Sequence, residues 1–241
     1  MANELQAIPT GVRVVITDIE GTTTSISFVR DTLFPYARPR LGSWLRAHAE
    51  EEAAQAVQAQ VQHETGQALT QEQVIRQLED WSDADRKVTP LKTLQGLIWA
   101  AGYADGSLIA PLYPDVAPAL SHWRTAGLTL GVYSSGSVAA QQLLFGHTGA
   151  GDLTGWFSHW FDTTVGGKLE SESYRHIAAS LGVPASAILF LSDHSGEVAA
   201  AQQAGWHAWR IARADSPPPA APVAGQVTLG GFAGIDVVLT P

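Results

Sequence analysis

The chain has 241 residues, of which 45% are hydrophobic and only 15% charged, and its formal net charge is −9. A chain of this size buries roughly 70 to 75% of its unfolded surface, so the composition predicts an ordered globule with a substantial core. Its 14 lysines and arginines are spread thinly, which argues against an extended nucleic-acid surface. The absence of cysteine excludes disulfides, thiolate metal sites and thiol catalysis.

The N-terminal stretch lacks a basic region followed by an apolar core, and no later stretch has the roughly 18 to 20 apolar residues of a membrane span. We therefore expect a cytoplasmic protein whose partners include neither a membrane nor a nucleic acid. No long exposed apolar stripe indicates an obligate dimer, so we expect a monomer. A small anionic substrate is compatible with the negative charge if a metal ion or a lysine supplies positive charge locally.

Short runs of apolar and β-branched residues predict the strands of a parallel sheet. The first run is Val12–Thr17, and similar runs follow at Thr129–Tyr133, Ile188–Leu191 and Trp209–Ile211. Each is preceded or followed by a helix-like segment. This alternation predicts an α/β fold with a Rossmann-like, doubly wound parallel sheet.

The long interval between the first two predicted strands has helical patterning and no strong strand signal. Helices are predicted at about Asp31–Glu64, Gln71–Asp85 and Leu91–Ala101. A right-handed crossover needs far fewer residues, so we expect a mostly helical cap at 26–111, inserted into a core of residues 1–25 and 112–241. Trp81 and Trp99 are predicted to pack within these helices. The Pro- and Ala-rich stretch Ser216–Val223 predicts a loop.

Polar groups follow the predicted strands, and in open α/β sheets the ligand crevice lies beyond the carboxyl ends of the strands. Four segments carry such groups: Asp18–Thr23, Ser134–Ser137, Gly166–Lys168 and Ser192–Glu197. Each segment alone is equally well explained by helix caps and turns. Together they supply a carboxylate pair, a serine-rich turn, a lysine and a further carboxylate, which are the groups that catalyse phosphoryl transfer.

In this order the segments resemble the four motifs of the haloacid dehalogenase superfamily, whose members use an aspartate nucleophile on a Rossmann-like sheet. More narrowly, five segments resemble the enolase-phosphatases of methionine salvage, and these lie at 18–23, 133–138, 143–147, 161–163 and 168–174. The resemblance covers essentially the whole chain. It implies an enzyme, a magnesium-dependent phosphoric monoester hydrolase.

The resemblance assigns one Mg²⁺ per subunit to Asp18, the main-chain carbonyl of Glu20, and Asp193. A cation is needed because like charges ~4 Å apart cost about 4 kcal/mol at an effective dielectric of about 20, so a carboxylate and a phosphate ester repel each other. Mg²⁺ favours oxygen ligands and keeps several waters. Asp18 would then attack phosphorus and form an aspartyl-phosphate that water hydrolyses.

Roles for the remaining polar residues follow from the same resemblance. Glu20, where the superfamily at large usually has Asp, would act as general acid and base. Lys168 would stabilise charge on the phosphoryl group, unless it is a solvated lysine. Ser134 and Ser135 would hydrogen-bond the phosphate oxygens near a helix start, a role compatible with capping. Glu197 would support the metal or orient Lys168, or would be a first-turn helix acid.

The implied reaction begins with 2,3-diketo-5-methylthiopentyl-1-phosphate, which is first enolised and then dephosphorylated to 1,2-dihydroxy-3-keto-5-methylthiopentene. Glu20 and Lys168 are the candidates for the enolising base by proximity alone. The cap would enclose the apolar methylthio tail and exclude water.

Two other functions remain open. The first is a general small-metabolite phosphatase of the same fold without enolase activity, because fold and catalytic residues alone do not define a substrate. The second is a non-catalytic binding module, which would have no need to retain Asp18, Lys168 and Asp193 together.

Overall fold

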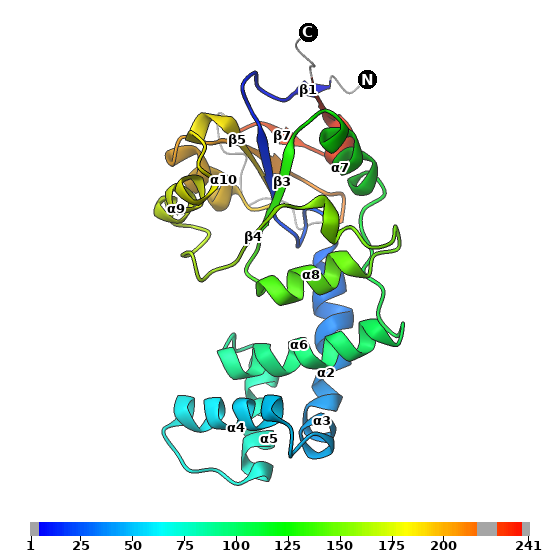
Figure 1. Ribbon diagram of the computed structural model, residues 1–241, viewed down its shortest axis with the longest axis vertical. Helices are drawn as coiled ribbons and strands as arrows, with labels where there is room; N and C mark the ends of the chain where they lie inside the picture. Colours follow the sequence, from blue (N-terminus) through cyan, green and yellow to red (C-terminus); the bar gives the residue numbers. More distant parts are fainter. Residues whose placement is uncertain (1–4, 216–225, 238–241) are drawn as a thin grey trace. The chain divides into compact units, whose positions relative to one another are not determined.

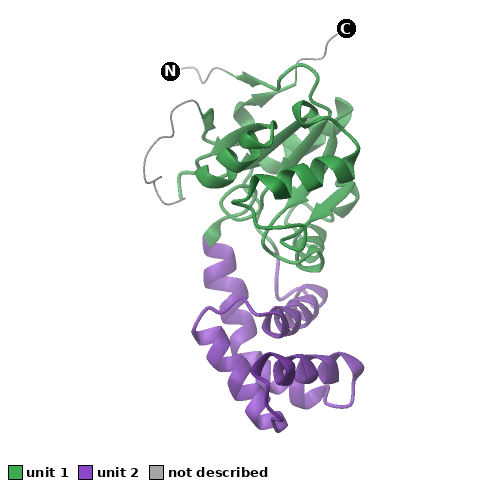
Figure 2. Ribbon diagram, turned by 90° about the vertical axis from the view of Figure 1, so that its left-hand side faces the viewer, with its two compact units in different colours: residues 1–26, 110–241 green, residues 27–109 purple. Residues whose placement is uncertain are grey.

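The computed structural model describes residues 5–215 and 226–237, and the chain divides into two compact units. The first comprises Met1–Ile26 and Ala110–Pro241, and the second comprises Ser27–Ile109 (Figure 2). The loop predicted at Ser216–Val223 lies outside the described residues. In the described part of the chain, no helix is long and apolar enough to cross a membrane.

The first unit is built on a six-stranded parallel sheet with the order β4-β3-β2-β5-β6-β7. Its strands are β2 (Val14–Thr17), β3 (Thr129–Tyr133), β4 (His159–Phe161), β5 (Ile188–Ser192), β6 (His207–Ile211) and β7 (Thr228–Leu229). A separate parallel pair joins β1 (Gln6–Ala7) to β8 (Ile235–Asp236). The predicted doubly wound parallel sheet is confirmed, and all four predicted strands are present.

Helices cover the sheet on both sides (Figure 1). They are α7 (Val116–Thr125), α8 (Val138–Gly146), α9 (Ser171–Leu181) and α10 (Ser195–Gln203). Apolar side chains of α9 and α10, including Tyr174, Ile177 and Val198, pack against Ile16 of β2 and Phe190 of β5. Because β2 and β5 are covered by helices, their residues are buried throughout, and this is why they read as continuous apolar runs.

Strand β4 was missed by the sequence prediction. It has three residues, His159–Phe161, and only Phe161 is buried. A run of three residues is too short to be recognised as a strand from its hydrophobic pattern.

The second unit is entirely helical where it has regular structure. Its helices are α1 (Ile26–Phe28, which begins at the unit boundary), a π-helical turn (Val29–Leu33), α2 (Phe34–Ala37), a 3₁₀ turn (Arg38–Arg40), α3 (Leu41–Ala47), α4 (Glu52–Thr65), α5 (Gln71–Asp83) and α6 (Thr89–Ala104). Their inward faces form one apolar core that includes Leu45, Val57, Leu78, Trp81 and Leu94. Trp81 is a core residue and Trp99 packs against this core, as predicted.

The prediction of one helix over Asp31–Glu64 was wrong. The chain is helical from Ile26 to Ala47 but passes through π and 3₁₀ turns, and α4 begins only at Glu52. Pro35 and Pro39 lie where the helical geometry changes, and a proline removes a donor from the α-helical hydrogen-bond ladder.

Candidate active site

The candidate site lies at the carboxyl end of β2, where Asp18 follows the last strand residue directly. The next residues form a tight loop in which the N–H groups of Thr22 and Thr23 both bond to the carbonyl of Ile19. Gly21 adopts a φ of 72°, a backbone conformation that residues other than glycine rarely adopt. A Cβ at this position would overlap the carboxylate of Asp193. Glycine is therefore required here by both backbone conformation and space.

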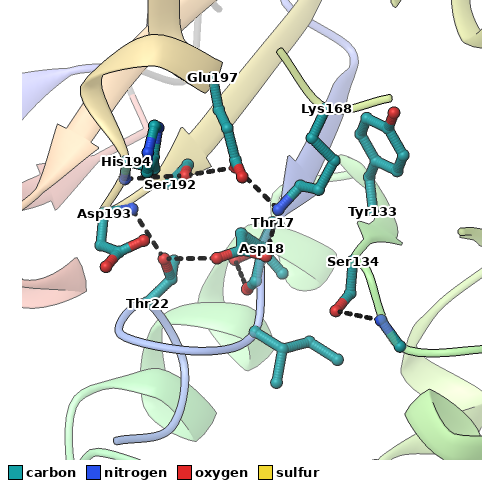
Figure 3. Close-up of polar contacts among 12 residues, drawn as sticks. Thr17, Asp18, Thr22, Tyr133, Ser134, Lys168, Ser192, Asp193, His194 and Glu197 are labelled. Carbon is teal, nitrogen blue, oxygen red and sulfur yellow. Dashed lines mark hydrogen bonds and ion pairs between the residues drawn. The ribbon is translucent and has the colours of Figure 1, made fainter. Parts of the chain in front are cut away.

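Lys168 joins the buried carboxylate of Asp18 to the partly buried carboxylate of Glu197 (Figure 3). Its Nζ lies 2.5 Å from Oδ1 of Asp18 and 2.7 Å from Oε2 of Glu197. Burial disfavours the ammonium, but the negative charges of Asp18 and Glu197 outweigh this effect and hold the pKa of Lys168 above its usual value. The lysine is therefore a permanently charged donor, and its position excludes the alternative of a solvated lysine.

Glu197 lies in the first turn of α10, where it also accepts a hydrogen bond of 2.8 Å from the hydroxyl of Ser192. Burial and the charge of Asp18 raise the pKa of Glu197, against a smaller opposing effect of Lys168. Of the roles considered for Glu197, its position matches that of orienting Lys168.

Thr22 connects the two carboxylates expected to bind metal. Its hydroxyl donates to Oδ2 of Asp18 at 3.3 Å and accepts the main-chain N–H of Asp193 at 3.0 Å. One side chain thus sets the spacing of the loops after β2 and β5. The sequence prediction missed this role, although Thr22 belongs to the segment that carries the resemblance.

The site has the donor chemistry for a magnesium ion. Burial and the charges of Asp18 and Glu197 raise the pKa of Asp193 to about 7, and the charges of Lys168 and Arg210 offset this only in part. A divalent cation would relieve this repulsion. Among the described residues, no group of three or more His, Cys, Asp or Glu side chains is arranged to hold a metal. The donors that fit are two carboxylates and a main-chain carbonyl, a set that suits Mg²⁺, which retains water ligands.

Glu20 is half-buried in the loop after β2, and its main chain forms a bridge with Thr24. The loop position is consistent with both predicted uses of this residue, its carbonyl as a metal ligand and its carboxylate as a general acid and base, and both remain predictions.

Ser134 and Ser135 follow β3, the neighbour of β2 in the sheet. Ser134 is buried, and its hydroxyl accepts the N–H of Gly136 at 3.3 Å, whereas Ser135 is exposed. The N-cap of α8 is Ser137, whose hydroxyl accepts the N–H of Ala140. Ser134 and Ser135 therefore do not cap this helix, and their binding of phosphate remains a prediction.

Lys168 does not follow a strand directly, which departs from the sequence prediction. It lies in the loop between β4 and α9. His194 is exposed and caps α10, because its Nδ1 accepts the N–H of Gly196 at 3.2 Å.

Two arginines near the end of β6 contact the main chain of the site, and no sequence motif pointed to them. Arg210 donates from Nε to the carbonyl of Asp193 at 2.9 Å. Arg213 donates to the carbonyl of Thr22. The sequence signal that could have identified them is their position at and just after the end of a strand, since such residues face the crevice of an open sheet.

Comparisons with known proteins agree with this geometry. Residues 12–205 match the family model for hydrolases described as haloacid dehalogenase-like. The UTR4 protein of Saccharomyces cerevisiae has a similar structure, with a TM-score of 0.78 and 30% identity over 92% of this chain and 98% of that one. The L-2-haloacid dehalogenase of Xanthobacter autotrophicus, at 17% identity and a TM-score of 0.55, shares the fold over 92% of this chain and 96% of its own.

The parallel sheet, the Asp18–Lys168 pair and the family match define the class: the chain is a haloacid dehalogenase-like hydrolase, as its motifs predicted. Among its relatives, the enolase-phosphatase E1 of Pectobacterium carotovorum is 51% identical over 85% of this chain and 90% of its own length. That of Picosynechococcus is 48% identical over 90% and 96%. The chain belongs to the enolase-phosphatase E1 family.

Proposed function

We propose that this protein is the enolase-phosphatase of methionine salvage. It converts 2,3-diketo-5-methylthiopentyl-1-phosphate to 1,2-dihydroxy-3-keto-5-methylthiopentene and phosphate, by enolisation followed by dephosphorylation. Relatives named enolase-phosphatase E1, about half identical over most of the chain, support the substrate. The observation that carries the chemistry is the buried Asp18 carboxylate, held by Lys168 on one oxygen and Thr22 on the other.

The nucleophile in this proposal is Asp18. Its carboxylate accepts hydrogen bonds from Lys168 and Thr22, so the orientation of the carboxylate is set before the substrate binds. An oxygen of Asp18 bonds to phosphorus while the bond from phosphorus to the substrate oxygen breaks, which gives an aspartyl-phosphate. Water then attacks phosphorus, the bond to Asp18 breaks, and phosphate leaves.

Glu20 moves the protons. It donates one to the leaving oxygen in the first step and takes one from the attacking water in the second. Lys168 keeps its charge throughout and stabilises the negative charge that builds up on the phosphoryl oxygens. Ser134 and Ser135 bind the phosphate oxygens. Of the two candidates for the base that enolises the diketone, Glu20 and Lys168, Glu20 fits this site better, because an ammonium that keeps its proton cannot accept another.

One Mg²⁺ per subunit, when held by Asp18, the carbonyl of Glu20 and Asp193, supplies positive charge against the phosphate and polarises a nearby carbonyl. The raised pKa of Asp193 supports this assignment, because burial and two neighbouring carboxylates make a further cation favourable there. We also propose that the chain acts as a cytoplasmic monomer, and that its helical segment at 26–111 serves as a cap for the apolar end of the substrate.

The test is to give the purified protein the diketo phosphate with magnesium, and to follow the enol by ultraviolet absorbance and phosphate by a coupled assay. p-Nitrophenyl phosphate and a sugar phosphate serve as control substrates. An enol signal followed by phosphate release, with strong preference for the diketo phosphate, supports the proposal. Comparable turnover of the control esters without an enol signal would favour the general phosphatase instead.

A further inference from the structure

The loop that carries Lys168 has no regular structure, yet its main chain is held at three successive carbonyls. The hydroxyl of Tyr133 donates to the carbonyl of Gly166 at 2.9 Å, and that of Ser173 donates to Gly167 at 2.8 Å. The hydroxyl of Tyr174 donates to the carbonyl of Lys168 itself at 2.7 Å. We call these three hydroxyl groups the hydroxyl clamp.

The donors of the hydroxyl clamp are rigidly placed. Tyr133 lies on β3, and Ser173 and Tyr174 lie on α9, and all three side chains are at most 1% exposed. The rings of Tyr133 and Tyr174 pack edge to face, with centroids 5.5 Å apart. Since a buried aromatic side chain in such a cluster has little freedom, each hydroxyl points at its carbonyl without further ordering.

The loop is also pressed closely against α9. Gly166 has a φ of 131°, and a Cβ there would overlap the hydroxyl of Ser173. The hydrogen bond from Ser173 to the next carbonyl therefore depends on glycine at 166. Backbone conformation and hydroxyl donors together define one path for the chain into Lys168.

Lys168 is consequently fixed at both ends. Tyr174 holds its carbonyl, and the carboxylates of Asp18 and Glu197 hold its ammonium. Nζ lies 5.7 Å from the centroid of the Tyr133 ring and 5.9 Å from that of Phe190, so both rings also contact the ammonium end of the side chain. The carboxylates hold the ammonium by charge, whereas the main-chain position determines how far Nζ reaches.

We propose that Tyr133, Ser173 and Tyr174 are positioning residues for Lys168, and that turnover depends on these hydroxyls although none of them reaches the substrate. The inference rests on the proposed role of Lys168 in phosphoryl transfer. Loss of one hydroxyl loosens the loop and shifts Nζ away from the transferring phosphoryl group. A displacement of this kind lowers the rate of chemistry more than it weakens substrate binding.

Tyr174→Phe tests the proposal, because it removes one oxygen and keeps the ring. We expect kcat to fall about tenfold while KM changes less than about twofold, with a melting temperature lower by about 2 to 4 °C. Thr125→Ala is the matched control, since it removes a hydroxyl that donates to a carbonyl on the exposed side of α7, at 2.9 Å. This control should keep full activity.

A double-mutant cycle separates positioning from a general structural effect. In a Lys168→Ala background, Tyr174→Phe should cause no further loss of residual turnover, because there is no ammonium left to misplace. Calorimetric binding of orthovanadate, a mimic of the transferring phosphoryl group, gives the same cycle when residual turnover is too slow to measure. The same loss with and without Lys168, or full activity of Tyr174→Phe, would overturn the proposal.

The outcome is independent of the substrate assignment. All variants are assayed on both the diketo phosphate and p-nitrophenyl phosphate. If the wild type hydrolyses only the simple ester, the methionine-salvage function fails, while the cycle on that ester still tests the hydroxyl clamp.

Discussion

Arg213 donates two hydrogen bonds to the main-chain carbonyl of Thr22, from Nε at 3.0 Å and from Nη2 at 2.7 Å. The third nitrogen of the guanidinium group, Nη1, binds both carboxylate oxygens of Asp115, at 2.7 and 2.8 Å. The ring of Tyr113 covers the group, 4.2 Å from Cζ to the ring centroid. A residue remote in sequence thus holds the loop whose threonine side chain spaces Asp18 and Asp193.

This arrangement predicts that Arg213→Met both destabilises the protein and weakens magnesium binding at the site. Removing one partner of a largely buried ion pair costs up to about 3 to 5 kcal/mol, because Asp115 loses its cation and keeps only the N–H groups of Phe232 and Ala233. The released carbonyl of Thr22 should also loosen the spacing of the two carboxylates, so the magnesium concentration needed for half-maximal activity should rise. Urea unfolding and a magnesium titration measure the two effects.

Arg175→Met is the control for Arg213, because Arg175 forms an exposed ion pair with Glu172 within α9. Exposed pairs contribute at most about 1 kcal/mol, so this variant should remain close to the wild type in both measurements. Equal destabilisation of the two variants would show that the buried arginine has no special role.

Gly21→Ala should abolish most activity beyond what its loss of stability explains. The substitution places a side chain at a φ of 72° and against the carboxylate of Asp193. Gly182 offers a matched control, with a φ of 65° and open space around its Cβ position. Both alanine variants should lose about 1 to 2 kcal/mol of stability from the left-handed conformation. Only Gly21→Ala should lower kcat/KM, by about a hundredfold or more.

The comparison of these two glycines is made by chemical denaturation and by phosphate release under the same conditions. Full activity in folded Gly21→Ala would mean that the position of Asp193 is not critical.

The sequence could predict the sheet and the groups at its carboxyl edge, because both follow from local rules. Buried parallel strands such as β2 and β5 are continuous apolar runs, and Asp18 and Asp193 come directly after them. The contacts that hold those groups in place are different in kind. The hydrogen bonds from Arg213 to Thr22 and from Tyr133 to Gly166 join residues far apart in the chain, so no local sequence pattern predicts them.

The same limit explains the errors in the second unit. Hydrophobic periodicity runs on through Pro35 and Pro39, so it predicted one long helix where the backbone changes its hydrogen-bonding pattern. Strand β4 pairs with β3 although two of its three residues are only half-buried, so it is defined by its neighbour and not by its own sequence.

Asp193→Asn should make the metal-free protein more stable above neutral pH. The pKa of Asp193 is raised to about 7 by burial and by the charges of Asp18 and Glu197. A carboxyl whose pKa is raised in the folded state contributes stability below its unfolded pKa of about 4, and this is lost as pH rises through about 7. At pH 8 the neutral asparagine should therefore be more stable than the wild type by more than about 1 kcal/mol.

Added magnesium should reverse the order of stability, so that the wild type becomes more stable than Asp193→Asn. The wild type should gain melting temperature with magnesium, whereas Asp193→Asn should gain little, because it has lost a charged ligand. Asp80→Asn, on the exposed face of α5, is the control and should match the wild type with and without the metal. A metal-free Asp193→Asn variant that is less stable than the wild type at pH 8 would contradict the prediction.

Lys168→Met should be among the most destabilising substitutions in the first unit. It leaves the buried Asp18 and the partly buried Glu197 without their shared cation, at a cost of up to about 3 to 5 kcal/mol. Adding Glu197→Gln removes one of the two charges, so the double variant should recover part of this stability while remaining inactive. Thermal unfolding measures the stability of the two variants. A double variant less stable than Lys168→Met would show that the unbalanced charges do not cause the destabilisation.

Asp18→Asn separates the two halves of the proposed reaction. The amide keeps the size of the carboxylate but is a poor nucleophile, so phosphate release should fall by at least about a thousandfold. Enolisation needs a base and a polarised carbonyl; this change leaves the candidate base Glu20 in place, and the amide oxygen of the asparagine can still bind the metal. We therefore expect the ultraviolet signal of the enol to appear and persist without phosphate release. Phosphate release above about one hundredth of the wild-type rate would exclude Asp18 as the nucleophile, and loss of both signals would place Asp18 in the enolisation step as well.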